Sequence, residues 1–201
     1  EATSNVPGSI PEWREVVVDR ARSNYETFKN HTAILFWSLG NESYAGSNIA
    51  AMNKLYKDHD SSRLTHYEGV FHAPEFKKEI SDLESCMYLP PKEAEEYLQN
   101  PKKPLVECEY MHDMGNSDGG MGSYIKLIDK YPQYMGGFIW DFIDQALLVH
   151  DPVSGQDVLR YGGDFDDRHS DYEFSGDGLM FADRTPKPAM QEVRYYYGLH
   201  K

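Results

Sequence analysis

Five apolar runs of β type alternate with segments of helical periodicity along this chain, and each run ends in polar or ionisable residues. Such alternation is typical of βα units around a parallel sheet, which places the chain in the α/β class. The predicted strands are 33–39, 64–68, 82–88, 104–110 and 137–143. Five strands cannot close an eight-stranded barrel. Either three strands escape this pattern, or part of the fold lies outside the sequence.

Helical stripes occupy several of the intervening segments. Trp13, Val17, Ala21, Tyr25 and Phe28 recur every three to four residues, and Ser9 with Glu12 has the spacing of a capping box. Further stripes follow residue 42, residue 120 and residue 188. The segment 149–175 is acidic and without a clear period, so we predict an irregular connection there.

Composition narrows the class of partner. The chain has 201 residues, 40% of them hydrophobic, and a formal net charge of −13. These values predict a soluble globular protein and argue against nucleic acid or an anionic membrane as partner. No stretch is long and apolar enough to span a membrane. Cys86 and Cys108 lie in apolar runs, so we expect two buried, reduced thiols and a cytoplasmic location.

Two glutamates stand where a barrel would carry its chemistry. Glu42 follows the run 33–39 through Gly40, and Glu109 ends the run 104–110 with Glu107 on the same side of the strand. Each has a plain structural interpretation: Glu42 as an acid at a helix start, and Glu109 as half of an ion pair. Together, two carboxylates at strand ends favour a glycosidase, which needs an acid and a second carboxylate beside one sugar.

Aromatic residues also gather at strand ends, among them Tyr88, Tyr110 and Trp140. Aromatic faces stack on sugar rings, but aromatic side chains also dominate protein cores. A sugar-binding module without catalysis would show the same pattern. The histidines near strand ends are more simply structural. No HExxH, CxxC pair, phosphate loop or GxSxG elbow occurs, which disfavours the commonest metalloprotease, zinc, nucleotide and serine-hydrolase interpretations.

Four sequence blocks, taken in order, resemble one family. Residues 30–43 (NHTAILFWSLGNES) resemble the acid/base signature of glycoside hydrolase family two. Residues 107–117 (ECEYMHDMGNS) resemble the nucleophile region of that family's LacZ-type β-galactosidase branch. Residues 136–145 (GGFIWDFIDQ) and 178–186 (GLMFADRTP) match two further blocks. The resemblance runs from about Trp13 to the end of the chain.

The resemblance implies that residues 1–201 are the C-terminal part of a catalytic (β/α)₈ TIM barrel, with about five of the eight βα units present. It also implies retaining hydrolysis of terminal β-D-galactosides such as lactose, with Glu109 as nucleophile and Glu42 as acid/base. Alternatives are another glycosidase of the family, such as a β-glucuronidase, and a fragment that binds sugar without turnover. We expect this chain alone to be inactive, because much of the supporting shell would come from the rest of the enzyme.

Further roles follow from the same resemblance. Asn41, Tyr88, His112 and Trp140 correspond to residues that bind substrate or hydrogen-bond the nucleophile. Glu42 corresponds to a ligand of the active-site magnesium. Phe174 and Asp177 lie at the family's sodium site, where Asp177 replaces a customary asparagine. The family's upstream Glu-x-His magnesium ligands would fall near residues 1–7. The expected partners are a β-galactoside, the remainder of the enzyme and further copies of the chain in a homo-oligomer.

Overall fold

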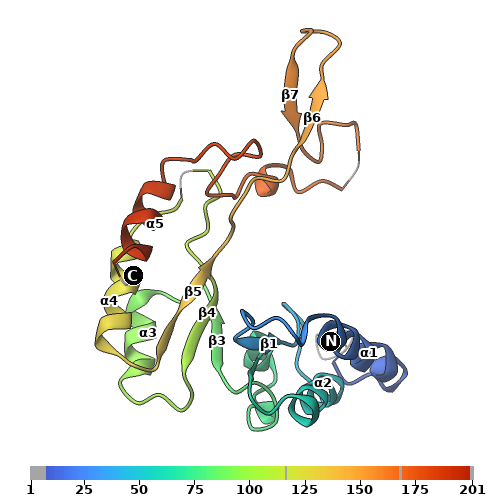
Figure 1. The fold of residues 1–201 in the computed structure, drawn as a ribbon, viewed down its shortest axis with the longest axis vertical. Coiled ribbons are helices and arrows are strands. Elements are labelled where there is room, and N and C mark those ends of the chain that lie inside the picture. Colours follow the sequence, from blue (N-terminus) through green and yellow to red (C-terminus); the bar gives the residue numbers. More distant parts are fainter. Residues whose placement is uncertain (1–7, 116, 168, 200–201) are drawn as a thin grey trace. The chain divides into compact units, whose positions relative to one another are not determined.

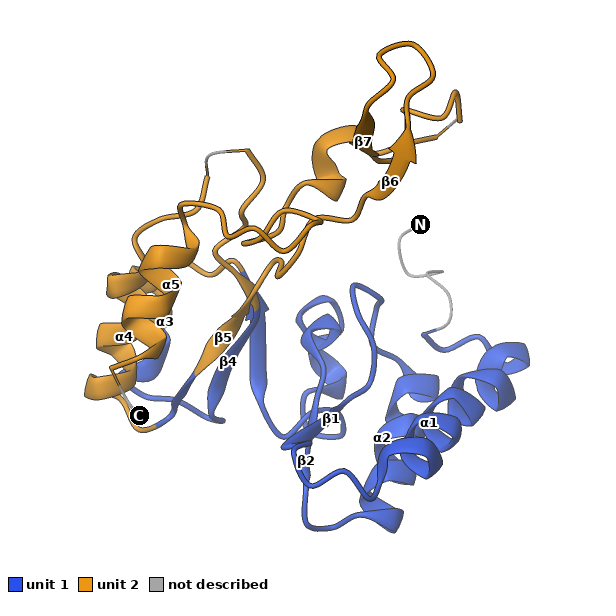
Figure 2. Ribbon diagram, turned by 45° about the horizontal axis from the view of Figure 1, so that its top comes forward, with its two compact units in different colours: residues 1–87, 96–108, 133–135 blue, residues 88–95, 109–132, 136–201 orange. Residues whose placement is uncertain are grey.

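The computed structural model describes residues 8–115, 117–167 and 169–199. The chain divides into two compact units, which Figure 2 distinguishes by colour. Unit 1 comprises residues 1–87, 96–108 and 133–135, and unit 2 comprises residues 88–95, 109–132 and 136–201. Each unit has its own cluster of buried apolar side chains.

Unit 1 opens with two helices that pack against a parallel pair of strands. A short 3₁₀ helix η2 (Pro11–Trp13) leads into α1 (Arg14–Phe28), and α2 (Ser47–His59) lies beside α1 (Figure 1). β1 (Phe36–Ser38) pairs in parallel with β2 (Leu64–His66). The Trp37 ring is buried and stacks on Tyr56 with 5.3 Å between centroids. This aromatic contact joins β1 to α2.

The predicted capping role of Ser9 is wrong. α1 has no side-chain cap, because the turn η2 with Pro11 precedes it. The Ser9 hydroxyl instead accepts a hydrogen bond from the Ser47 N–H (3.0 Å), at the first turn of α2. The Gly8 carbonyl accepts from the Asn48 N–H (2.9 Å) at the same helix end. The segment before α1 therefore satisfies the free amide groups of a helix nearly forty residues downstream.

Two short helices and a loop connect β2 to the next strand. η3 (Glu68–His72) and η4 (Pro74–Phe76) lead to β3 (Glu84–Met87). The Asp82 N–H donates to the Thr65 carbonyl (2.9 Å), and the Asp82 carboxylate accepts from the Thr65 N–H (2.7 Å). These bonds tie the start of the β3 segment to β2. The predicted strand 64–68 ends early, at His66, because the helix η3 begins at Glu68.

A second, three-stranded sheet has the order β3–β4–β5. β4 is Leu105–Tyr110 and β5 is Tyr134–Ile139, with α3 (Pro91–Leu98) before β4 and α4 (Met121–Lys130) before β5. The Glu84 N–H donates to the Pro104 carbonyl, and the Tyr88 N–H donates to the Glu109 carbonyl. Partners that rise together along both chains indicate parallel strands. The bonds between β4 and β5 follow the same sense.

The last predicted strand, 137–143, is shifted. β5 begins and ends about four residues earlier, and residues 141–144 bond elsewhere. The Asp141 N–H donates to the Asp177 carbonyl (2.9 Å), and the Leu179 N–H donates to the Asp141 carbonyl (3.1 Å). The apolar run thus forms backbone hydrogen bonds with two segments in turn, first with β4 and then with residues 177–180.

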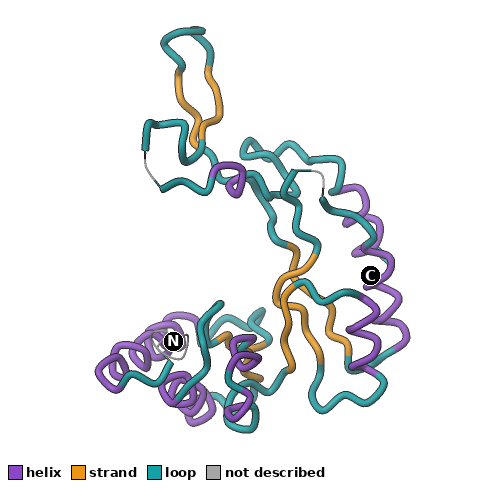
Figure 3. The backbone as a smooth tube through the Cα atoms, turned by 180° about the vertical axis from the view of Figure 1, so that it is seen from behind, coloured by secondary structure: helices purple, strands orange, loops and turns teal. Residues whose placement is uncertain are grey.

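Unit 2 also corrects the prediction of an irregular 149–175 segment. β6 (Leu147–His150) and β7 (Asp157–Arg160) form an antiparallel hairpin, which Figure 3 shows as a separate pair of strands. The 3₁₀ helix η5 (Tyr172–Ser175) follows the hairpin, and α5 (Met190–Tyr197) packs beside α4. Met121 and Val193 are buried in the core that these two helices share.

The described strands β1 to β5 correspond to the five predicted strands, with the two boundary shifts given above and with a shorter β1, which begins at Phe36 rather than at residue 33. The helices α2, α3 and α4 separate them, as expected of a partial βα barrel. Neither cysteine forms a disulfide within the described part of the chain, and both are half-buried rather than fully buried. No helix in the described ranges is long and apolar enough to cross a membrane.

Glu107 is the most deeply buried carboxylate of β4. Its side chain is 0% exposed, and its Oε1 accepts a hydrogen bond from the Tyr134 hydroxyl of β5 (2.7 Å). A buried carboxylate is costly unless hydrogen bonds satisfy it. The bond therefore holds β4 against β5 close to Glu109.

Replacing the Tyr134 hydroxyl should destabilise the fold measurably. We expect Tyr134→Phe to lower the free energy of unfolding by about 1.5–3 kcal/mol, the range for a hydrogen bond to a charged group. The matched control is Tyr131→Phe, whose hydroxyl donates to the more exposed Glu95 (3.1 Å) and should cost less than about 1 kcal/mol. Denaturant titration of both variants provides the measurement. Equal losses would contradict the role given to Glu107.

Candidate active site

Glu109 lies at the end of β4 and is bound to Tyr88 twice. The Tyr88 hydroxyl donates to Glu109 Oε2 (2.6 Å), and the Tyr88 N–H donates to the Glu109 carbonyl (2.8 Å). Tyr88 directly follows β3 and has φ +52°, in the left-handed region. That turn directs the phenol back towards the neighbouring strand. One oxygen of the half-buried Glu109 carboxylate is therefore held by a short, charge-assisted hydrogen bond.

Four other predicted residues gather in the same unit. The Trp140 indole N–H donates to Asp177 Oδ2 (3.2 Å), and His112 Nε2 lies 3.6 Å from the same oxygen. The Phe174 ring lies 5.5 Å from His112 and 6.5 Å from Trp140, between centroids. His112 also lies 5.7 Å from the Tyr88 ring. Unit 2 thus brings together Tyr88, Glu109, His112, Trp140, Phe174 and Asp177.

Asp177 is suited to hold a cation. The residue is 1% exposed, and its Oδ1 has no hydrogen-bond partner within the described ranges. A buried carboxylate oxygen without a donor is costly, and a hard cation such as Na⁺ would satisfy it. A carboxylate here in place of an asparagine amide adds negative charge without removing the oxygen ligand.

Further acidic residues surround this group. Burial and the neighbouring Asp118 carboxylate raise the pKa of Asp113 to about 6. Burial also raises the pKa of Asp141. The side chain of Lys187 is paired with Asp144 (2.8 Å). The local field of unit 2 is therefore negative, which favours cations and neutral ligands over anions.

Glu42 lies in the loop after β1, within unit 1. Its side chain is exposed, its φ is +50°, and its N–H donates to a carboxylate oxygen of Glu68. The neighbouring Tyr67 hydroxyl donates to the Ser43 carbonyl. A Cβ at Gly69 would collide with that same carbonyl, so only glycine allows this close approach. Residues 67–69 therefore fix the backbone of the Glu42 loop at residues 42 and 43. Asn41, beside Glu42, is also exposed.

Glu68 was not singled out from the sequence. It is 8% exposed, and its carboxylate supports the backbone of Glu42. The available signal was the one that identified Glu42 and Glu109: an acid at or just after the end of a predicted strand. Residues 1–7, near which the Glu-x-His magnesium ligands would fall, lie outside the described residues.

Comparisons with known proteins place the chain in a family. The model of glycosyl hydrolases family 2, TIM barrel domain, matches residues 1–201. The chain is 84% identical over 202 residues to the β-galactosidase large subunit of Lactobacillus acidophilus, covering 100% of this chain and 32% of the relative. It is 55% identical over 198 residues to a β-galactosidase of Halalkalibacterium halodurans, covering 98% and 19%. The chain belongs to glycosyl hydrolase family 2.

Solved structures agree on the fold. A family 2 β-galacturonidase from Eisenbergiella tayi superposes with a TM-score of 0.62 at 17% identity, over 95% of this chain and 38% of that one. The β-glucuronidase of Ruminococcus gnavus gives 0.59 at 17%, over 93% and 36%. These values support a shared barrel fold. The chain spans about a third or less of the length of these curated relatives.

Proposed function

We propose that the protein containing this chain is a retaining β-galactosidase, in which Glu109 is the nucleophile and Glu42 the acid/base. The observation that carries the proposal is the Glu109–Tyr88 hydrogen bond beside His112 and Trp140. The Tyr88 hydroxyl fixes the Glu109 carboxylate, and the Trp140 ring in the same group could stack on a sugar. Relatives named β-galactosidases at 84% and 55% identity support the choice of sugar.

The chemistry proceeds in two displacements. Glu109 attacks the anomeric carbon, and the bond from that carbon to the leaving oxygen breaks as Glu42 protonates the oxygen. A water then loses its proton to Glu42 and attacks the same carbon, which releases Glu109. The mechanism requires the two carboxyl groups to lie about 5–5.5 Å apart. Tyr88 holds one oxygen of Glu109, so the other is the attacking atom.

The aromatic group would bind the galactosyl ring. The Trp140 indole is fixed by its bond to Asp177, and its face would form an apolar floor for the sugar. His112, close to the same carboxylate, would contact galactosyl hydroxyls, and Asn41 would do so beside Glu42. The acidic surroundings disfavour the alternative of a β-glucuronidase, because the carboxylates of Asp113 and Asp141 would repel a uronate carboxylate.

We propose that the enzyme binds two cations through these residues. The exposed Glu42 offers hard oxygen ligands for Mg²⁺, which would add positive charge near the leaving group. Asp177 Oδ1, with Phe174 beside the site, would hold Na⁺ near the galactosyl hydroxyls.

Assembly and location complete the proposal. A relative named as a large subunit belongs to an enzyme of more than one kind of chain. We infer that this chain is likewise part of a larger polypeptide that assembles with further chains, in the cytoplasm. Catalysis then requires the rest of that polypeptide.

The nucleophile is tested by substitution and labelling. In the full-length protein, Glu109→Gln should lower turnover of a galactoside by several orders of magnitude, because the covalent intermediate cannot form. The exposed Glu93→Gln is the control and should retain activity. A 2-fluorogalactoside should label Glu109 covalently, as read by peptide mass spectrometry. A label on another carboxylate would refute the assignment.

The acid is tested with leaving groups of different basicity. Glu42→Ala should slow hydrolysis of lactose far more than that of a nitrophenyl galactoside, because only a poor leaving group needs protonation. Azide should restore turnover and give a β-galactosyl azide. Glu75→Ala, an exposed acid in η4, serves as control. Equal losses on both substrates without an azide product would argue against the role of Glu42.

Cation dependence follows from the ligands. Removal of divalent ions by a chelator should lower kcat and Mg²⁺ should restore it, and exchange of Na⁺ for a bulky organic cation should raise KM. Asp177→Ala should abolish the response to Na⁺ while leaving the response to Mg²⁺. Full activity without either ion would overturn both assignments.

A further inference from the structure

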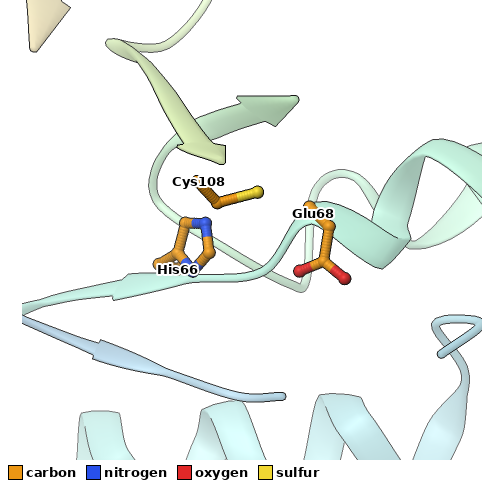
Figure 4. A group of neighbouring side chains, drawn as sticks. All are labelled: His66, Glu68 and Cys108. Carbon is orange, nitrogen blue, oxygen red and sulfur yellow. The ribbon is translucent and has the colours of Figure 1, made fainter. Parts of the chain in front are cut away.

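A third group of ligating side chains lies in unit 1, apart from the residues given catalytic roles. His66, Glu68 and Cys108 each offer one ligand atom, and these atoms lie within 4.8 Å of one another. They come from the end of β2, the start of η3 and the middle of β4, and Figure 4 shows them converging. Within the described ranges this is the one such group of three or more histidine, cysteine or acidic residues.

We propose that His66, Glu68 and Cys108 form a binding site for Zn²⁺, whose occupancy inhibits the enzyme. An imidazole nitrogen, a thiolate and a carboxylate are the ligands that Zn²⁺ takes in proteins, usually as three side chains and one water. Mg²⁺ and Ca²⁺ prefer oxygen alone, so the thiol selects against them. Zinc ligands lie about 3.5 Å apart in a tetrahedron, so the side chains must close in by about 1 Å.

The surroundings prepare the ligands for a metal. His66 is 5% exposed, and burial lowers its pKa to about 4, so the imidazole is neutral near pH 7. Its Nδ1 lies 3.0 Å from the Ser38 hydroxyl, and its Nε2 lies 2.6 Å from the Ser85 hydroxyl. Zinc would displace the serine hydroxyl from the ring nitrogen that it binds, and the other nitrogen would keep its serine partner, which orients the ring.

The thiol is similarly placed. Cys108 Sγ donates a weak hydrogen bond to the Cys86 carbonyl (3.4 Å). On zinc binding the thiol proton passes to solvent, and the sulfur lone pair forms the bond to the metal. The half-buried position of Cys108 allows that exchange without unfolding of β4.

Zinc binding at this site would affect the proposed catalytic acid, Glu42, through Glu68. The carboxylate of Glu68 accepts the N–H of Glu42, which has a left-handed backbone. A zinc ion would draw charge from this carboxylate and pull it towards Cys108. The support behind the Glu42 loop would weaken, and protonation of the leaving group would slow. This coupling rests on the proposed function, whereas the binding of zinc does not.

The site is tested first by spectroscopy on the full-length protein, with Co²⁺ as the probe and Zn²⁺ as competitor. We expect a thiolate-to-cobalt charge-transfer band that zinc abolishes. Cys108→Ser should eliminate the band, and His66→Gln should weaken cobalt binding at least about tenfold. Cys86→Ser, the matched control on the neighbouring strand, should keep the band. Circular dichroism confirms that each variant is folded, and Cys108→Ala replaces Cys108→Ser if the serine variant does not fold.

The proposal is overturned if the folded wild type shows no such band, or if Cys86→Ser loses it as fully as Cys108→Ser does. The coupling is tested separately, by zinc titration of galactoside hydrolysis at constant Mg²⁺. Zinc should inhibit the wild type and Cys86→Ser, but should inhibit Cys108→Ser much less. Equal inhibition of all three would refute the coupling. A zinc-sensitive band in a protein without any galactosidase activity would sustain the site and refute the proposed function.

Discussion

Parallel strands carry their carboxyl ends to one edge of a sheet, and this constraint determines where the polar residues of the candidate site occur. In the β3–β4–β5 sheet, β3 leads into Tyr88, β4 carries Glu109 next to its last residue, and β5 leads into Trp140. In the separate β1–β2 sheet, β1 leads into the Glu42 loop. The strands are short, and they contribute Trp37 of β1, Leu105 and Val106 of β4 and Tyr134 of β5 to the buried apolar residues. The residue that leaves the core at the end of each strand is free to do chemistry.

Both proposed catalytic glutamates are supported by a neighbouring strand segment. Glu109 is held by the Tyr88 hydroxyl from the end of β3, and the backbone of Glu42 is held by the Glu68 carboxylate after β2. The two supports differ in kind. Tyr88 acts on the carboxylate itself, whereas Glu68 acts on the peptide and leaves the Glu42 side chain exposed to solvent. A fixed nucleophile and an accessible acid suit a mechanism in which only the acid must exchange protons with water.

The sequence predicted the strands and the placement of the two glutamates correctly where a local run of apolar residues coincides with a strand of the structure. The runs around β1, β3 and β4 each contain buried apolar residues: Trp37 and Leu39, Leu83, and Leu105 with Val106. These residues were sufficient to locate the three strands. β5 was misplaced because residues 141–144 form backbone hydrogen bonds with residues 177–180 rather than with β4. A local sequence pattern does not predict a partner so distant in the chain. The hairpin β6–β7 was missed because its strands have only four residues each and are largely exposed, so neither shows the long buried run by which the other strands were located. Ser9 was misassigned since its hydroxyl caps a helix remote in sequence. Glu68 required the structure, because its role depends on a contact with the backbone of another strand's loop.

The central claim is that Glu42 and Glu109 act as one retaining pair. The stereochemistry of the first product tests it most directly. Proton NMR of a β-galactoside hydrolysed by the full-length protein, followed from the earliest minutes, distinguishes the anomers before they interconvert. A double displacement releases β-galactose first, and the α anomer then grows by mutarotation. Release of α-galactose as the first product would show a single displacement and contradict a covalent intermediate on Glu109.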